Sequence, residues 1–222
     1  MWRDAALVAG RDLRIELRSR VATSQVAPFA VLVLVLFAFA LDPDRGVLTR
    51  ATPGLYWIVV LLSAVLAVGR ASAIDEADGI RDALRLSLLE PAGVFLGKVV
   101  AVAAQLALLE AVLLVGVAIL YDAPLGGAGL LAATCAAATV AIASTGVLYG
   151  TLVGGLRGRE TLLPLLLLPV LAPVLIGTTR AFEVAFGGLA TNGWAWCGLV
   201  TLFALIYLVT GSLTYGVLLE DT

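Results

Sequence analysis

Histidine is absent from this 222-residue chain, and methionine occurs once, at Met1. The common axial ligands of haem iron and the most common general base of enzymes are therefore missing. The only two cysteines, Cys135 and Cys197, each lie in an apolar run, and their spacing is not that of a metal site. Buried, inert thiols are the simpler interpretation. The sequence thus predicts no catalytic residue, no metal site and no cofactor bound by this chain itself.

Charge is also scarce. Charged residues make up 14% of the chain and hydrophobic residues 61%, whereas soluble domains carry about 25% charged residues. Six apolar runs come close to or exceed the roughly 20 residues that span a bilayer; they are Ser24–Leu41, Leu55–Ala73, Val99–Tyr121, Ala128–Leu156, Thr161–Thr179 and Trp194–Leu219. The sequence predicts an all-α integral membrane protein with six transmembrane helices, in one domain covering 1–222 and in contact with membrane lipid. The net charge of −2 indicates no nucleic-acid partner.

Residues 1–20 are amphipathic. On a helix, Trp2 and Leu17 share an apolar face, whereas Arg11 and Arg18 share a charged one. The pattern predicts an interfacial helix that leads into the first span. A signal peptide is the alternative, but the region before the apolar run is too long and too acidic for a typical n-region.

The most charged internal stretch, residues 69–98, interrupts the hydrophobic pattern after the second run. A charge at the centre of a transmembrane helix costs about 2.5–3.5 kcal/mol on insertion scales, so this segment must reach water. Within it, Ile80, Leu84 and Leu88 recur at helical spacing and Pro91 ends the pattern. A short amphipathic helix suits docking in a groove of a soluble partner; a solvated loop with an interfacial helix is the alternative. The candidate partner-binding residues are Asp75, Glu76, Asp78, Arg81 and Arg85.

Basic residues are unevenly distributed between the predicted loops. Eleven of the fourteen Lys and Arg residues fall in the N-terminal stretch and in the loops after the second and fourth runs. The positive-inside rule places these segments and both termini in the cytoplasm. Segment 69–98 is therefore predicted to be a cytoplasmic coupling segment.

The fourth run carries glycine at every fourth position, at Gly146, Gly150 and Gly154. Stacked on one helix face, these residues form a groove that lets another helix approach closely. The partner helix belongs either to the same chain or to a second subunit. Packing within the chain is the simpler interpretation, because the motif is common in membrane bundles.

The fifth run contains three prolines. Pro164 lies near its start, where proline is tolerated, so Pro169 and Pro173 are the informative ones. Each removes a backbone donor and bends the helix, which predicts a broken or strongly kinked span of the kind found near transport pathways. Arg159 and Glu160, just before them, are a second candidate contact for a cytoplasmic partner.

Glu110 is the one carboxylate deep inside a predicted span. An ionisable residue at that depth is a candidate functional residue by default. The alternative is a protonated or hydrogen-bonded carboxyl that holds two helices together. The absence of a basic partner inside any predicted span favours this alternative.

Residues 93–98, GVFLGK, have some likeness to a phosphate-binding loop. Three residues rather than four separate the two glycines, and Val99 stands where a Ser or Thr would reach magnesium. The segment also follows no predicted strand. We therefore reject nucleotide binding by this chain and expect any ATPase activity in a partner subunit.

Three stretches carry a family resemblance: RDLRIELRSR near the N-terminus, the loop EADGIRDALRLSLLEPAGVFLGK, and RETLLPLLLLPVLAPVLIGTTRA. Together they resemble the haem exporter protein B (CcmB) family, in order and over nearly the whole chain. The third stretch is the most specific, because generic hydrophobicity would not combine its prolines with the preceding Arg-Glu pair. Ala77, between Glu76 and Asp78, departs from the family pattern.

The resemblance implies an ABC-2-like exporter subunit, namely the membrane subunit of the cytochrome c maturation ABC transporter in the cell inner membrane. It implies a homodimer, a cytoplasmic ATPase subunit (CcmA-like) that binds ATP and magnesium, and a haem-handling membrane protein (CcmC-like) that presents haem to a periplasmic chaperone. Haem, where it is bound, is expected on a partner. Both haem export and ATP-driven release of the loaded chaperone are compatible with this role, and the missing His and Met ligands favour release.

Two other classes stay open on the residues alone. One is an ABC exporter membrane subunit for another hydrophobic substrate. The other is a non-transporting membrane scaffold in which the loop only anchors a partner. ATPase activity of the purified complex, compared with that of a complex with an ATPase-dead partner, separates the first role from the others.

Overall fold

The computed structural model describes residues 1–19, 26–41, 45–77, 89–121, 123, 126–154, 158–188 and 191–221. These residues form seven α-helices and no strand, which confirms the all-α class over the described part of the chain. The helices are α1 (Trp2–Ser19), α2 (Ala27–Leu41), α3 (Arg45–Ala77), α5 (Pro91–Leu120), α6 (Ala128–Val153), α7 (Arg159–Ala185) and α8 (Gly193–Asp221).

Five of the described helices, α3 and α5 to α8, are long and apolar enough to cross a membrane. Helix α2 is apolar but has 15 residues, about 22 Å at 1.5 Å per residue, which is shorter than the roughly 30 Å hydrocarbon core. Residues 24–25 of the first predicted span lie outside the described residues. The multi-pass membrane class is therefore confirmed, whereas a sixth span stays a prediction.

Two of the spans begin earlier than the sequence predicted. The apolar segment of α3 begins at Gly46 instead of Leu55, because the helix continues through Pro53. Helix α5 begins at Pro91 instead of Val99. Proline is well tolerated at the first position of a helix, where its missing N–H would have no partner anyway, so Pro91 starts a helix as well as ending the loop pattern.

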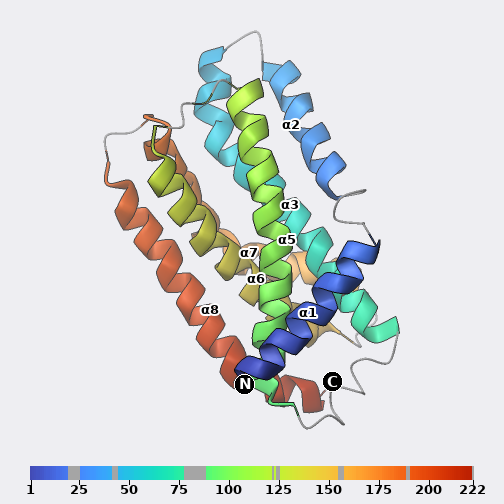
Figure 1. Ribbon diagram of the computed structural model, residues 1–222. Helices are drawn as coiled ribbons and strands as arrows, with labels where there is room; N and C mark the ends of the chain where they lie inside the picture. Colours follow the sequence, from blue (N-terminus) through green and yellow to red (C-terminus); the bar gives the residue numbers. More distant parts are fainter. Residues whose placement is uncertain are drawn as a thin grey trace.

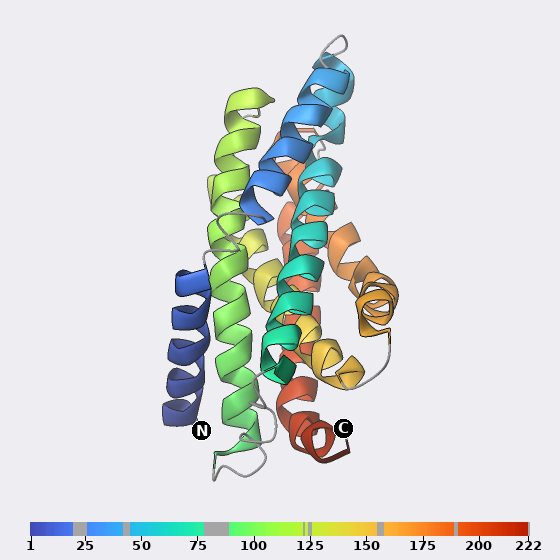
Figure 2. The same cartoon turned by 90° about the vertical axis from the view of Figure 1, so that its right-hand side faces the viewer.

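The long helices run up and down beside one another, and both termini lie at the same end of the bundle (Figure 1). The last turns of α3 and the first turns of α5 lie toward this end as well. We call it the terminal end. Helix α1 packs along the half of α5 that is nearer the terminal end. Helix α2 lies beside the opposite half of the bundle (Figure 2). Helix α2 leads to the opposite end, and the five long helices described after it, an odd number, return the chain to the terminal end (Figure 1).

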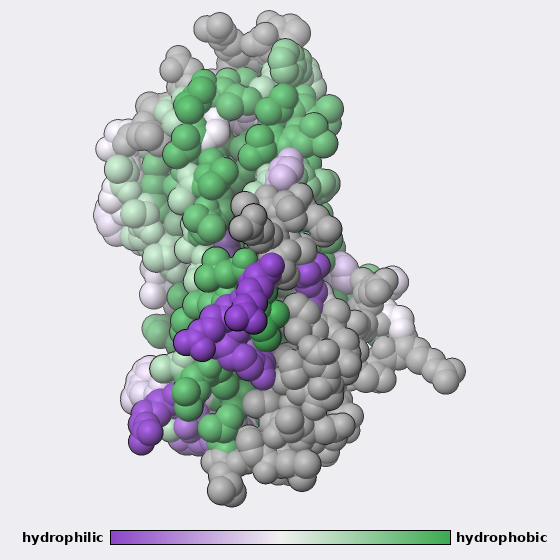
Figure 3. All heavy atoms as spheres, turned by 45° about the vertical axis from the view of Figure 1, so that its right-hand side comes forward, coloured by the Kyte–Doolittle hydropathy of each residue, from purple (hydrophilic) through white to green (hydrophobic). Residues whose placement is uncertain are grey.

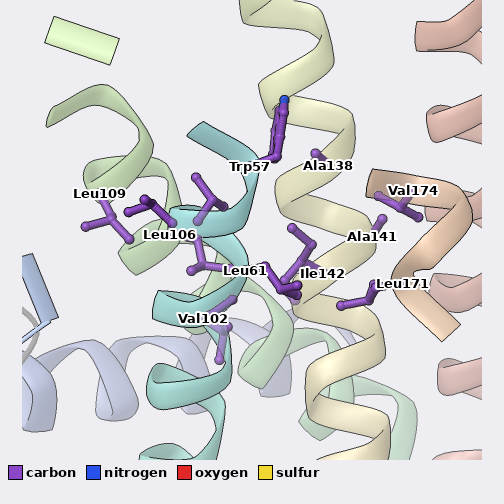
Figure 4. Close-up of a cluster of buried hydrophobic side chains, with 14 of the residues drawn as sticks. Trp57, Leu61, Val102, Leu106, Leu109, Ala138, Ala141, Ile142, Leu171 and Val174 are labelled. Carbon is purple, nitrogen blue, oxygen red and sulfur yellow. The ribbon is translucent and has the colours of Figure 1, made fainter. Parts of the chain in front are cut away.

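The core is formed by side chains from the middle of the long helices. Figure 4 shows Trp57 and Leu61 of α3, Leu106 of α5, and Ala141 and Ile142 of α6 converging in one buried cluster. Because lipid is as apolar as these side chains, close packing stabilises the contact between the helices more than the hydrophobic effect does.

Glycines set the closest approaches between helices. A Cβ atom at Gly146 of α6 would lie 2.5 Å from Val68 Cγ2 of α3, so this glycine packs against a helix of the same chain. Gly150 is buried in α6, whereas Gly154 caps its end. A Cβ atom at Gly211 of α8 would overlap the ring of Phe95 of α5. The last contact was not predicted from the sequence.

Helix α7 continues through all three of its prolines without interruption. Of the predicted broken or strongly kinked span, the broken form is therefore wrong, whereas a strong kink stays a prediction. The hydroxyl of Tyr207 in α8 donates a hydrogen bond to the carbonyl oxygen of Val170 at 2.8 Å, next to Pro169. Contacts with a neighbouring helix are a usual reason why membrane helices tolerate proline.

Candidate functional site

Two polar clusters are built on α5. The cluster nearer the terminal end joins α5 to α1, and we call it the α1 seat; it comprises Gly93, Gly97 and Lys98 of α5 with Ala5, Val8 and Asp12 of α1. The second cluster joins α5 to α3 and α6, and we call it the Glu110 site; it comprises Glu110, Tyr56, Cys135 and Thr139.

Close backbone contact holds α1 in its seat. A Cβ atom at Gly97 would lie 2.7 Å from the carbonyl oxygen of Ala5 and 2.7 Å from Val8 Cβ. A Cβ atom at Gly93, one turn earlier, would lie 2.8 Å from the carbonyl oxygen of Met1. No side chain fits in either position without displacing α1. The two glycines that suggest a phosphate-binding loop in the sequence therefore serve helix packing.

Lys98, predicted in the loop, lies inside α5 and is buried. Its Nζ atom lies 4.0 Å from the Asp12 Oδ2 atom of α1. A buried ammonium needs such a partner because the loss of hydration is costly. A cavity of about 60 Å³ adjoins the pair between α1, α3, α5 and α6, and Glu16, Gln105 and Thr151 contribute polar groups to its wall. The seat is thus a polar junction of four helices.

The outer edge of the seat is exposed. The N-terminal ammonium group lies 2.8 Å from the Glu90 Oε2 atom and 3.2 Å from the Asp4 Oδ2 atom. The hydrogen bond to Glu90, followed by the one to Asp4, raises the pKa of the ammonium group. The same ammonium group lowers the pKa of the Asp4 carboxyl. These contacts tie the first turn of α1 to the residue just before α5.

The face of α1 that packs on α5 consists of small residues, including Ala5 and Val8. Trp2 and Leu17, which the sequence places on the apolar face, are 75% and 76% exposed. The glycine seat accepts only small side chains, which leaves the large ones at the surface. Figure 3 shows a hydrophilic band crossing the otherwise hydrophobic surface where α1 lies. Exposed large apolar groups beside charged groups suit a helix in the membrane interface.

The structure describes none of the side chains that were predicted to contact an ATPase. Not described are Asp78, Arg81 and Arg85 and the side chains of Asp75, Glu76, Arg159 and Glu160. The backbone of α3 ends at Ala77 and that of α7 begins at Arg159, and both of these helix ends point toward the terminal end (Figures 1 and 2). The two predicted contact segments are thus attached to the same end of the bundle as the α1 seat.

The Glu110 site is a hydrogen-bonded junction of three helices. Glu110 is 2% exposed. Its Oε2 atom accepts a hydrogen bond of 2.9 Å from the Thr139 hydroxyl of α6, and its backbone carbonyl accepts one of 3.1 Å from the Tyr56 hydroxyl of α3. The Tyr56 oxygen also lies 3.7 Å from Cys135 Sγ. The geometry is that of a carboxyl that joins helices, one of the two interpretations of this residue from the sequence.

Sequence reasoning missed both the α1 seat and the partners of Glu110. The seat had a signal, since Gly93 and Gly97 stand four residues apart in a helix-forming context, a spacing that allows close helix contact. The partners of Glu110 had none. Tyr56 and Thr139 are 54 and 29 residues away from it in the chain, and hydroxyl residues are common in membrane helices.

Comparisons with known proteins match most of the chain to one family. A family model described as CcmB protein matches residues 4–217. Heme exporter protein B of Haemophilus influenzae is 32% identical over 207 residues, which cover 86% of this chain and 90% of that protein. The protein of the same name from Bradyrhizobium diazoefficiens is 32% identical over 203 residues, 90% of both chains. The one from Paracoccus denitrificans is 31% identical over 187 residues, 80% of this chain and 82% of that protein.

Proposed function

Because the chain belongs to the CcmB family, we propose that it is the membrane-spanning subunit of an ABC transporter for cytochrome c biogenesis. A separate cytoplasmic subunit, CcmA-like, binds ATP and magnesium and hydrolyses ATP. This chain converts that motion into haem export or into release of a haem-loaded periplasmic chaperone. The observation that carries the proposal is the similarity, over most of its length, to proteins named heme exporter protein B.

The α1 seat supports a role in coupling. A coupling element needs a rigid connection between its contact surface and the membrane spans. Backbone contact at Gly93 and Gly97 and the ion pair between Asp12 and Lys98 provide this connection between α1 and α5. Packed interiors transmit displacement because they are barely compressible. A push on α1, or on the chain just before Pro91, therefore moves α5 as one body.

The charged residues around α3 and α7 provide specificity in this proposal. Asp75, Glu76, Asp78, Arg81 and Arg85, with Arg159 and Glu160, form the contact with the ATPase. Charges at such a contact set partner choice and association rate more than raw affinity. The same proposal includes a homodimer and a CcmC-like haem-handling partner in the inner membrane, with haem held by partners.

Both termini are proposed to be cytoplasmic. The basic residues of α1, together with Arg70 and Lys98, belong to the half of the bundle at the terminal end, whereas Arg50 and Arg180 lie toward the opposite end. The positive-inside rule then orients the terminal end to the cytoplasm. Reporter fusions after Thr222 and within residues 123–127 are expected to report opposite compartments, and a periplasmic C-terminus would contradict the proposal.

Deletion of the gene tests the function directly. Covalent haem in c-type cytochromes is expected to disappear in the deletion strain and to return when the chain is supplied from a plasmid. Normal cytochromes c in the deletion strain would exclude the role. Restoration by the chain together with an ATPase-dead partner would leave only the scaffold alternative, because no ATP-driven step would then be needed.

Haem binding by the isolated chain is a separate test. The chain has no histidine and no methionine beyond Met1, so we expect no six-coordinate haem on the purified protein. The measurement is a Soret spectrum after haem addition, with a CcmC-like partner added in a parallel sample. A tight six-coordinate spectrum from the chain alone would contradict the proposal that partners hold the haem.

A further inference from the structure

A groove of about 540 Å³ runs between α5 and α6, beside the Glu110 site. Its walls consist mainly of alanine side chains, among them Ala103, Ala104, Ala107, Ala111, Ala132 and Ala136. Most of these alanines are exposed at the surface of the bundle. The groove lies within two helices that are long and apolar enough to cross the membrane. Whatever fills it is therefore in the membrane as well.

The spacing of the small residues fits a helix. Ala104, Ala107 and Ala111 follow one another along one face of α5, and Ala132 and Ala136 are one turn apart on α6. Small residues at such spacing let a neighbouring helix approach closely, and the gain comes from van der Waals contact along its length.

The floor of the groove contains an unsatisfied acceptor. Glu110 lines it together with Thr139 and Cys135. Thr139 donates to Oε2, but Oε1 accepts no hydrogen bond from any residue that the structure describes, although the carboxyl is 2% exposed. The Cys135 thiol lies against the same carboxyl, and a thiol is only a weak donor. A buried acceptor without a donor is costly in an apolar setting, and an acyl chain has no donor to offer.

We propose that the α5–α6 groove receives a transmembrane helix of a different polypeptide. The small residues of that helix pack on the alanines, and one hydroxyl, amide or basic side chain donates a hydrogen bond to Glu110 Oε1. A second copy of this chain is a poorer match. A two-fold contact through this groove would set one hollow against another and leave its volume unfilled. The inference is independent of the transported species and of the ATPase.

Site-specific photo-crosslinking in native membranes tests the occupant. A benzophenone amino acid is placed at Ala107 or at Ala136, with Leu205 on α8, which is 54% exposed, as the control position. Ala107 and Ala136 are expected to give an adduct to a transmembrane segment of another polypeptide, with a hydroxyl, amide or basic residue within one turn of the attachment point. Leu205 is expected to give no such adduct. Adducts to lipid alone, or to a second copy of this chain, overturn the proposal.

Changes at the acceptor test the hydrogen bond. Glu110→Leu is expected to lower the adduct yield at Ala107 about threefold and at most about twentyfold, which correspond to the average and the maximum strength measured for interhelical hydrogen bonds in membranes. Glu110→Gln keeps an acceptor oxygen and is expected to retain most of the yield. An unchanged yield with Glu110→Leu contradicts the assignment of the donor.

A third variant keeps the test valid if Glu110→Leu folds poorly. Ala107→Trp fills the groove and leaves the carboxyl in place, so it is expected to abolish the adduct from Ala136. Ala195→Trp, at an exposed alanine on α8, is the matched control and is expected to leave that adduct unchanged. Equal yields with the two tryptophan variants would show that the groove does not hold the partner.

Discussion

The α1 seat and the Glu110 site both lie on α5, yet they join helices by different means. At the seat, glycines allow backbone contact, and opposite charges meet where the Asp12 side chain is still 20% exposed. At the Glu110 site, the described donors are hydroxyls and the carboxyl is almost fully buried. Charge is tolerable near the water-facing end of a helix but expensive within the membrane, where neutral hydrogen bonds replace ion pairs. We therefore expect the stability of the seat to depend on side-chain size and on salt, and that of the Glu110 site to be independent of salt.

The largest effect is expected from steric change at the seat. Gly97→Leu would force a side chain against the Ala5 backbone, and overpacking of this kind costs about 1–3 kcal/mol. Gly10→Leu, where a Cβ atom meets nothing within 4 Å, is the control. It should stabilise α1 slightly, because leucine favours a helix more than glycine by up to about 1 kcal/mol. Thermal unfolding in detergent measures both, and equal stability of the two variants would mean that α1 does not sit on Gly97.

A smaller loss of stability is expected from a change at the Glu110 site. Thr139→Val removes the hydroxyl that donates to Glu110 and should lower the free energy of unfolding by about 0.6 kcal/mol and at most about 1.7 kcal/mol, the average and the maximum measured for hydrogen bonds between membrane helices. Thr145→Val is the control on the same helix, because its hydroxyl donates to its own helix at Ala141. Chemical or thermal unfolding compares the two. If Thr145→Val lowered stability as much as Thr139→Val, the hydrogen bond between the helices would contribute no more than one within a helix.

The smallest effect is expected from the ion pair at the seat. A double-mutant cycle of Asp12→Asn and Lys98→Met should give a coupling energy below about 1 kcal/mol, as for other partly exposed ion pairs. Salt near 1 M, where the screening length is about 3 Å, should reduce this coupling. The coupling between Thr139 and Glu110 should stay constant over the same range. Salt dependence of both couplings, or of neither, would remove the contrast between the two clusters.

The fold class was predictable because composition and apolar runs decide it. The start of α3 was not, because Pro53 reads as a helix breaker in the sequence but lies inside the helix. The start of α5 was missed for a related reason. Lys98 reads as a loop residue until Asp12, from a helix far away in sequence, is seen beside it.

The candidate sites were also only partly predictable from the sequence. Glu110 could be singled out from the sequence because a carboxylate among apolar residues is rare. Its partners could not, since Tyr56 and Thr139 come from other helices, and local patterns hold no information about which helices become neighbours. The continuity of α7 through Pro169 and Pro173 was missed as well, because a rule about single residues takes no account of the packing around the helix.

Recruitment of the proposed ATPase subunit tests the central proposal, that the terminal end of this CcmB-family chain receives ATP-driven motion. The measurement is co-purification of the ATPase subunit with the double variant Glu76→Lys and Asp78→Lys. The matched control is Asp42→Lys with Asp44→Lys, a charge reversal of equal size in the predicted loop on the opposite side. We expect the first variant to lose the ATPase and cytochrome c maturation while still inserting into the membrane, and the control to keep both. Full recruitment with lysine at both 76 and 78 would contradict the claim.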